Sequence, residues 1–170
     1  MIAARRIVAV VMVGAALSAI ACVTATSDAR VVEEVPDRAT FPMVSDLLDH
    51  RCGTLDCHGV TYRNLRIYGR EGLRLAPTDR PTSKPNTTTA AEYEATYESL
   101  VSLEPELMTA LVAEGGARPE RLTFVRKARG SEDHKGLGIW NEGGPEDLCV
   151  TTWLAGKIDT AACQKALLVR

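Results

Sequence analysis

Residues 51–59, RCGTLDCHG, place two cysteines five positions apart and a histidine directly after the second cysteine. On a regular α-helix, an offset of five positions corresponds to about 140° of rotation, so the side chains of Cys52 and Cys57 would diverge. Both thiols can reach one partner only if the helix ends between them. We therefore expect a helix that ends at Cys52, with Gly53 in the left-handed conformation that commonly ends helices, followed by a tight loop.

Three kinds of site fit these residues. In the first, Cys52 and Cys57 form thioethers to a haem c group and His58 is an axial ligand of the iron, by analogy with the shorter C-x-x-C-H attachment motif. In the second, the two cysteines form a disulfide with each other and His58 is an ordinary polar residue. In the third, His50 joins them around a zinc ion, although the adjacent Cys57 and His58 are poorly placed to share one tetrahedral ion. The motif alone leaves the three alternatives open.

The first 22 residues indicate export from the cytoplasm. Two arginines among the first six residues precede the apolar run 7–21, which is shorter than the ~20 residues that span a bilayer and is typical of a signal peptide. The run ends in AIA, a cleavage pattern, directly before Cys22. This arrangement resembles the lipobox of bacterial lipoproteins, with Ala19 where that motif usually has Leu. The resemblance implies that residues 1–21 are removed and that lipid on Cys22 anchors the chain to a membrane of the bacterial envelope, on the periplasmic side; secretion without lipid is the alternative.

The remaining cysteines and the charge narrow the possibilities further. Besides Cys22 the chain has four cysteines, and free thiols are rare in an oxidising compartment. Four cysteines allow three pairings, among which the short separation favours a disulfide between Cys149 and Cys163. The formal net charge is −2, and the one basic stretch, 118–129, is short and contains Glu120. We therefore expect no nucleic-acid partner.

The pattern after the signal peptide predicts a polar tether over residues 22–39 and a single domain over residues 40–170, mainly α-helical. Leu65 and Ile67, then Leu73 and Leu75, alternate around a GREG turn, which predicts a small β-hairpin. The run PTDRPTSKPNTT predicts a long loop inserted after it. Helices are expected over 42–52, 89–101 (with a capping box of Thr89 and Glu92), 104–112, around 122–125, and from Pro145 to about Gly156.

The amphipathic stretch VSDLLDHRCGTLDCHG runs directly into the Cys-His motif, and RLTFVRKARGSEDHKGLGIW is followed by EDLCVTTWLAG. Together these segments resemble cytochrome c domains, particularly those of envelope proteins related to the planctomycete-type group. The resemblance covers about Phe41 to Gly156, with a variant C-x4-C-H spacing and a long insertion after the motif. It implies a cytochrome c-like helical fold with a covalent haem held by Cys52, Cys57 and His58. His134, which matches the family's His-x-Gly position, is implied as the sixth ligand of the iron.

Some residues around this motif have two interpretations. Met108 is an alternative iron ligand, but with Leu107 and Leu111 it is spaced like the packed face of a helix. The arginines at 63, 66, 70 and 74 are candidates to bind haem propionates or else to face solvent. The sequence thus favours an exported carrier of single electrons, which catalyses no bond-making reaction and exchanges electrons with a partner protein. The alternative is a haem-free, disulfide-stabilised envelope lipoprotein that acts as a binding or structural module.

Overall fold

The chain is mainly α-helical in the part that the structure describes. This computed structural model describes residues 34–78 and 87–169, so the expected signal peptide, Cys22 and most of the tether lie outside the described residues. No helix among the described residues is long and apolar enough to cross a membrane. The described helices are α2 (Phe41–Cys52), α3 (Ala90–Val101), α4 (Pro105–Ala113), the 3-10 helix η1 (Pro119–Arg121), α5 (Thr123–Arg129), α6 (Pro145–Leu154) and α7 (Thr160–Ala166).

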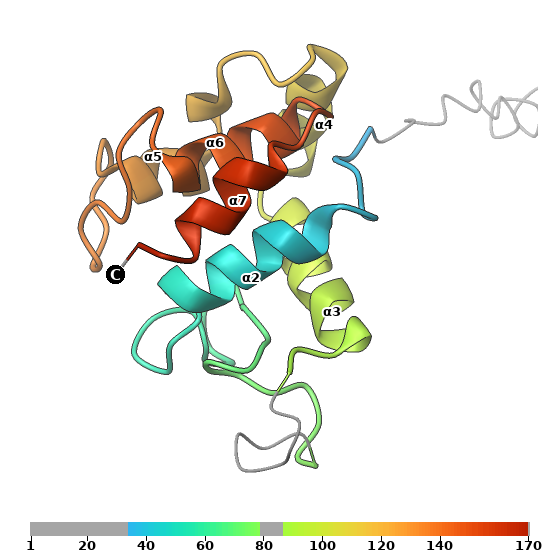
Figure 1. Ribbon diagram of the computed structural model, residues 1–170, viewed down its shortest axis with the longest axis vertical. Helices are drawn as coiled ribbons and strands as arrows, with labels where there is room; N and C mark the ends of the chain where they lie inside the picture. Colours follow the sequence, from blue (N-terminus) through green and yellow to red (C-terminus); the bar gives the residue numbers. More distant parts are fainter. Residues whose placement is uncertain (1–33, 79–86, 170) are drawn as a thin grey trace, which may run out of the picture. The chain divides into compact units, whose positions relative to one another are not determined.

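Three aromatic rings from three helices pack together in the core. The ring of Phe41 in α2 lies 5.2 Å from that of Tyr97 in α3 and 5.1 Å from that of Trp153 in α6, between centroids. The Tyr97 hydroxyl donates to the carbonyl oxygen of Pro36, and the Trp153 indole N–H donates to that of Asp37. The cluster buries a large apolar area while its polar tips hold the chain that enters α2. Figure 1 shows α2 with α3 on one side and α6 and α7 on the other.

Local sequence signals mark several of the helix boundaries. The capping box is confirmed: the Thr89 hydroxyl accepts from the N–H of Glu92, and the Glu92 carboxylate accepts from the N–H of Thr89. Proline occupies the first turn of α2, α4 and α6, where its missing N–H costs no hydrogen bond. Gly130 ends α5 with a φ of 74°, a left-handed conformation that favours glycine.

The predicted β-hairpin over residues 65–75 is wrong. Among the described residues there is no strand, and only an isolated bridge pairs Tyr68 with Leu73. Two N–H groups of this segment donate to side-chain hydroxyls of α3, and a third, that of Ile67, donates to the main-chain oxygen of His58. The N–H groups of this segment bond to α3 on one side and to His58 on the other, so they are not available to pair with a second strand.

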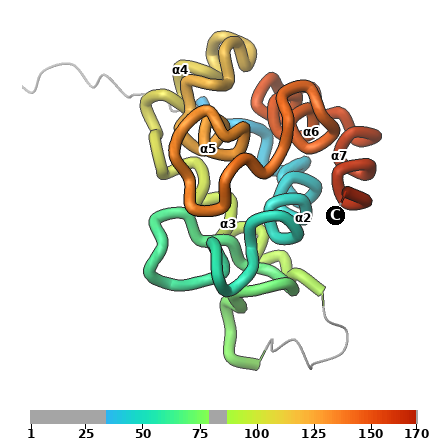
Figure 2. Tube along the Cα trace, turned by 90° about the vertical axis from the view of Figure 1, so that its left-hand side faces the viewer, coloured from blue at the N-terminus to red at the C-terminus, as the bar shows by residue number. Residues whose placement is uncertain are grey.

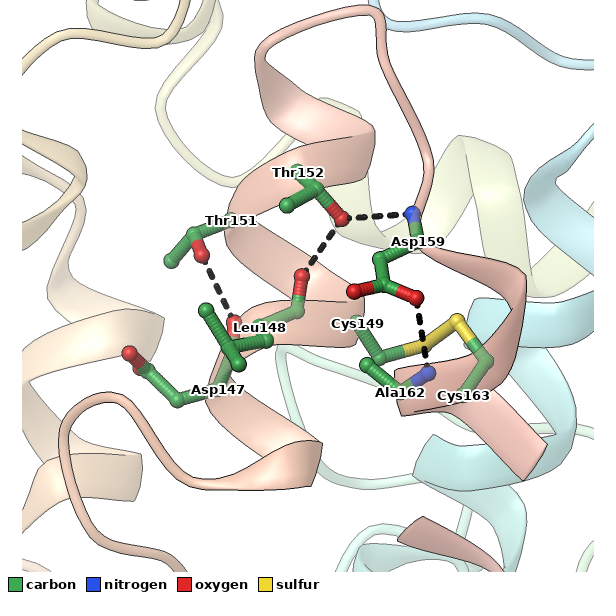
Figure 3. The surroundings of a disulfide bond; sticks show 8 residues. All are labelled: Asp147, Leu148, Cys149, Thr151, Thr152, Asp159, Ala162 and Cys163. Carbon is green, nitrogen blue, oxygen red and sulfur yellow. Dashed lines mark hydrogen bonds between the residues drawn. A yellow bond between two sulfur atoms is a disulfide. The ribbon is translucent and has the colours of Figure 1, made fainter. Parts of the chain in front are cut away.

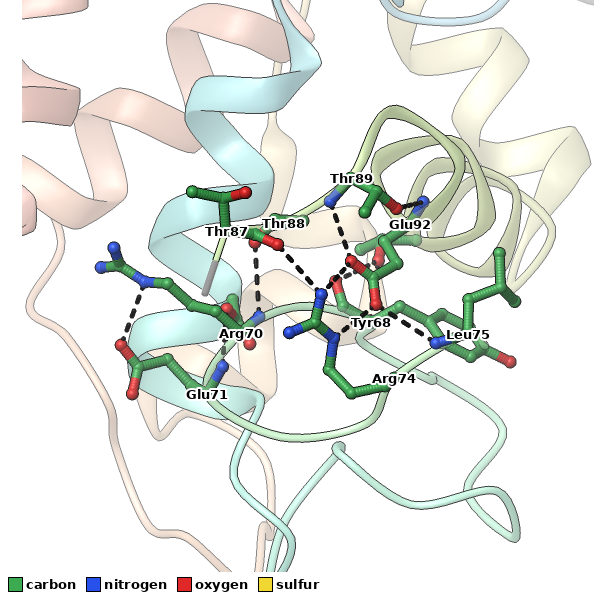
Figure 4. A network of polar contacts seen from close by, with 11 residues as sticks. Tyr68, Arg70, Glu71, Arg74, Leu75, Thr87, Thr88, Thr89 and Glu92 are labelled. Carbon is green, nitrogen blue, oxygen red and sulfur yellow. Dashed lines mark hydrogen bonds and ion pairs between the residues drawn. The ribbon is translucent and has the colours of Figure 1, made fainter. Parts of the chain in front are cut away.

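A buried ion pair connects the loop after the Cys-His motif to α3. Arg74 donates from Nε to Oε1 of Glu92 at 2.7 Å and from Nη2 to Oε2 at 3.0 Å, and the two side chains are 9% and 0% exposed. The N–H groups of Leu75 and Thr89 donate to the same carboxylate (Figure 4). Burial alone would raise the pKa of Glu92, but these donors hold it below its ordinary value. Arg74 therefore stabilises the loop and is buried, so the solvent-facing alternative for this arginine is wrong.

The predicted disulfide is confirmed. Cys149 of α6 is bonded to Cys163 of α7, and their Cα atoms are 4.7 Å apart. Beside the bond, the Asp159 side chain caps α7 by accepting from the N–H of Ala162, and the Thr152 hydroxyl accepts from the N–H of Asp159 (Figure 3). The covalent bond and the cap together hold α7 against α6.

A buried carboxyl group lies beneath the loop that follows α2. Asp49 is 2% exposed; its Oδ2 accepts from the N–H of Glu71 at 3.2 Å, and its Oδ1 has no partner among the described residues. Burial raises the pKa of Asp49 to about 6, and the negative charge of Glu71 adds to the effect. A Cβ atom on Gly53 would lie 2.6 Å from Oδ1 of this carboxyl. Gly53 has a φ of −79°, so the predicted left-handed conformation is wrong, and glycine is needed there for space.

We predict that Asp49→Asn stabilises the fold at neutral pH. A carboxyl whose pKa is raised in the folded state weakens stability as the pH rises. As the pH rises from about 4 to about 6, ionisation of Asp49 should therefore reduce the free energy of unfolding by about 1–3 kcal/mol, and the reduction should persist at higher pH. The amide keeps an acceptor for Glu71 and carries no charge. Urea unfolding at about pH 4 and about pH 7, with the exposed Glu106→Gln as control, checks this; a variant that is less stable than wild type at about pH 7 would contradict it.

Candidate functional site

A cavity of about 720 Å³ lies next to the Cys-His motif. Its walls come from the end of α2, the loop after α2, the turn between α3 and α4, helix α5, and the loop after α5. Figure 2 shows the loop after α2 next to the loop after α5, with α5 beside them. Cys52, Cys57, His58 and His134 all lie in the wall, and we name this space the Cys–His cavity. Its volume is within the range of about 300–1,000 Å³ that is typical of ligand and cofactor pockets.

The two histidines of the cavity lie close together. Their ring centroids are 5.9 Å apart and their planes are inclined by 17°. Nδ1 of His58 is 3.0 Å from the main-chain oxygen of Leu65, and Nδ1 of His134 is 3.2 Å from that of Leu137. Since a carbonyl can only accept, Nδ1 carries the proton in each ring and Nε2 is left with a lone pair. Metal-binding imidazoles are commonly held in this way, with one nitrogen bonded to a carbonyl and the other free for the metal.

The electrostatic surroundings keep His58 in its neutral form. Burial lowers the pKa of His58, and its electrostatic interactions with His134 and Arg63 lower it further, against the opposing effect of the Leu65 hydrogen bond. Neutral imidazole is the form that binds a metal ion, so the environment of His58 suits a ligand at neutral pH.

Both cysteines of the motif are free thiols that reach the cavity. The chain reverses between them, with the N–H of His58 donating to the oxygen of Cys52 at 2.9 Å and the N–H of Gly59 donating to that of Thr54 at 3.0 Å. Cys52, the last residue of α2, is 9% exposed, and Cys57 is half-buried in the loop. Burial raises the pKa of the Cys52 thiol to about 12, and the neighbouring Cys57 adds to the effect. The disulfide between these two cysteines, one of the alternatives from the sequence, is not formed.

The structure separates other candidate residues from the cavity. Met108, the alternative iron ligand, is 1% exposed in the core and is not part of the cavity wall. His50 also lies outside the wall, and no three His, Cys, Asp or Glu residues of the described segments are grouped to hold a metal ion. The zinc site is therefore not assembled. Of the arginines, Arg63 lines the cavity, while Arg70 pairs with Glu71.

The groups that orient the two rings were not anticipated from the sequence. They are main-chain carbonyls, which every residue has, so no residue type marks Leu65 or Leu137. For the second ring the sequence offers only the glycine-rich run KGLG, which indicates a turn. In the structure, Leu137 in this run has a φ of 59°, a left-handed conformation unusual for leucine. In this turn its N–H donates to the oxygen of His134 at 2.9 Å while its own oxygen contacts the His134 ring.

Comparison of the chain with models of protein families, with curated proteins and with solved structures found no match. The function must therefore be argued from the geometry of the Cys–His cavity.

We predict that the two motif thiols differ sharply in reactivity when no cofactor is attached. At about pH 8 a thiol with a pKa of about 12 is ionised only to about one part in 10⁴, and burial also blocks access. Cys57 should therefore react with an aromatic disulfide reagent at least about tenfold faster than Cys52. Cys52→Ser and Cys57→Ser variants, each made with Cys22→Ser, isolate the two rates. Equal rates would show that Cys52 is not buried as described.

Proposed function

We propose that this chain is an electron carrier that holds one covalent haem in the Cys–His cavity, as the resemblance to cytochrome c domains implies. The observation that carries the proposal is the separation of the two imidazoles. Two metal–nitrogen bonds of about 2 Å each, with about 1 Å from each nitrogen to its ring centre, correspond to centroids about 6 Å apart. The ring centroids of His58 and His134 are 5.9 Å apart, close to this value, and we propose that the two rings turn their Nε2 atoms toward one iron when haem is bound.

The thiols and the wall fit the same cofactor. Cys52 and Cys57 both line the cavity beside His58, and each thiol would add across one vinyl group, with its proton passing to the vinyl carbon. Phe124 and Trp140 contribute apolar side chains to the cavity wall. The proposal needs no residue from outside the described part of the chain.

Two imidazole ligands favour electron transfer over catalysis. When bound, a haem iron supplies reversible one-electron exchange, and its potential depends on its axial ligands and on the polarity of its site. If His58 and His134 both held the iron, a bound haem would supply one-electron exchange, and no ligand position would be left for a substrate. The chain's own task is then to hold both rings in place and to limit access of water, while the electrons come from and go to a partner protein.

We predict that the full chain, produced together with the haem c maturation machinery, is pigmented and carries haem that withstands denaturation. Mass spectrometry should find the haem on the peptide that contains Cys52 and Cys57. Cys52→Ser or Cys57→Ser should each leave one thioether, which shifts the alkaline pyridine haemochrome band. His134→Ala should keep the covalent haem but lose the six-coordinate, low-spin spectrum.

The control for the histidine variants is His50→Ala, because His50 lies outside the cavity wall. It should keep the spectrum of the parent protein. A colourless product from a strain that matures other c-type cytochromes would overturn the proposal and favour the haem-free binding or structural module. A low-spin spectrum that survives His134→Ala would remove His134 from the ligand set.

We also propose that the protein works in the bacterial cell envelope as a lipoprotein anchored through Cys22. The support is the signal-like sequence of residues 1–22 together with the disulfide between Cys149 and Cys163, a bond typical of oxidising compartments.

We predict that Cys22→Ala moves the protein from the membrane fraction to the soluble fraction of the envelope. Acylation would be lost, and the body has no other attachment predicted from the sequence. Detergent phase partitioning of labelled cells checks this, with Cys163→Ser as a control that removes a cysteine without touching the lipid site. A parent protein that is already soluble would support secretion without lipid.

A further inference from the structure

We infer that Thr96 and Ser99, two hydroxyl residues of α3, are positioning residues for the imidazole of His58. Their importance for electron transfer rests on the proposed function, whereas their contacts belong to the folded chain itself. Neither residue lines the Cys–His cavity, so they act on His58 only through the segment 65–68.

The first half of the argument is the set of bonds between α3 and this segment. Ser99 Oγ accepts from the N–H of Arg66 at 2.8 Å. Thr96 Oγ1 accepts from the N–H of Tyr68 at 2.9 Å and donates to the carbonyl oxygen of the same residue at 3.2 Å. The two hydroxyl residues are 0% and 9% exposed, for Thr96 and Ser99 respectively. Both bonds are partly shielded from water, so losing either one takes a hydrogen-bond partner from a main-chain N–H of the segment.

The second half is the set of bonds between the segment and His58. The N–H of Ile67 donates to the main-chain oxygen of His58 at 3.0 Å, and the oxygen of Leu65 accepts from the His58 ring. Partners therefore alternate along the segment: the N–H groups of 66 and 68 reach α3, and that of 67 reaches His58. One short stretch of chain holds both the backbone and the ring of His58, and α3 holds that stretch from the other side.

Ser and Thr at these two positions weaken the helix, so their presence indicates a role outside α3. Within a helix, buried Ser and Thr usually bond to their own helix four residues back, and both are weaker helix formers than Ala or Leu. Thr96 and Ser99 are three positions apart, on one face of α3, and both bond outward to the segment. Apolar residues at these positions would satisfy the helix but not the N–H groups of Arg66 and Tyr68.

The test is the tautomer of His58, which a merely structural role would not change. Ring ¹⁵N chemical shifts report the tautomer and the pKa in the full chain purified without haem. In Thr96→Val and Ser99→Ala, we expect the ratio of the Nδ1–H to the Nε2–H form to fall about fivefold, the effect of weakening one hydrogen bond. Thr96→Ser, which keeps the hydroxyl, should retain the parent ratio.

Two controls remove hydroxyls that make no hydrogen bond to the segment, one of them buried and one half-buried. Ser45 is 0% exposed on α2, with no partner for its Oγ among the described residues, and the Thr151 hydroxyl bonds to the oxygen of Asp147 within α6. Ser45→Ala and Thr151→Val should leave the tautomer of His58 unchanged. An unchanged tautomer in Thr96→Val and Ser99→Ala, with or without lower thermal stability, would overturn the inference.

The outcome separates this inference from the proposed function. If maturation yields no pigment but the tautomer shifts as expected, the haem proposal fails and the positioning role stands. In pigmented protein the same variants should shift the reduction potential and the electron paramagnetic resonance g-values, while both controls should not. If the haem-free chain does not fold, these two measurements decide, and parent values in both variants would overturn the inference.

Discussion

Two main-chain carbonyl oxygens, those of Leu65 and Leu137, determine which nitrogen of each cavity imidazole carries the proton. The oxygen of Leu65 lies 3.0 Å from Nδ1 of His58, and that of Leu137 lies 3.2 Å from Nδ1 of His134, so each Nε2 keeps a lone pair. The ring centroids of His58 and His134 are also 5.9 Å apart with their planes inclined by 17°, and the proposal assigns both rings to one iron. A pair of ordinary surface histidines would need none of these constraints. The proposed haem site therefore depends first on hydrogen bonds made by the backbone, and only then on the choice of side chains.

The surrounding structure explains how a small helical chain keeps those carbonyls in place. Segment 65–68 has no strand partner, and its N–H groups bond to hydroxyls of α3 instead. The buried ion pair of Arg74 and Glu92 fixes the chain that follows the segment. Asp49, beneath the same loop, is buried with one oxygen unpartnered, so it contributes an unfavourable term. The buried carboxyl of Asp49 therefore lowers the stability of the fold beneath the loop that leads to the cavity. The helices behind it are secured separately, by the aromatic cluster and by the disulfide.

Those parts of the fold that depend on local chemistry could be predicted from the sequence, and those that depend on distant contacts could not. The capping box of α3 acts over three positions and the disulfide joins Cys149 and Cys163 14 positions apart, and both predictions were confirmed. The hairpin failed because hydroxyls about 30 positions along the chain take its hydrogen bonds, and Gly53 was misread because the side chain of Asp49 fills the space beside it. Cys52, Cys57 and His58 all line one cavity, an arrangement that the spacing left open among three alternatives. The nearness of His134 was implied only by a family resemblance, and the carbonyls that orient both rings have no residue type to reveal them.

The central claim, that His58 and His134 hold one iron between them, is tested most directly by near-infrared magnetic circular dichroism of the oxidised protein after haem maturation. The energy of the charge-transfer band in that region identifies the pair of axial ligands. The account predicts the band of a low-spin haem with two imidazole ligands. A band typical of histidine with methionine, or a high-spin spectrum with water as a ligand, would contradict it.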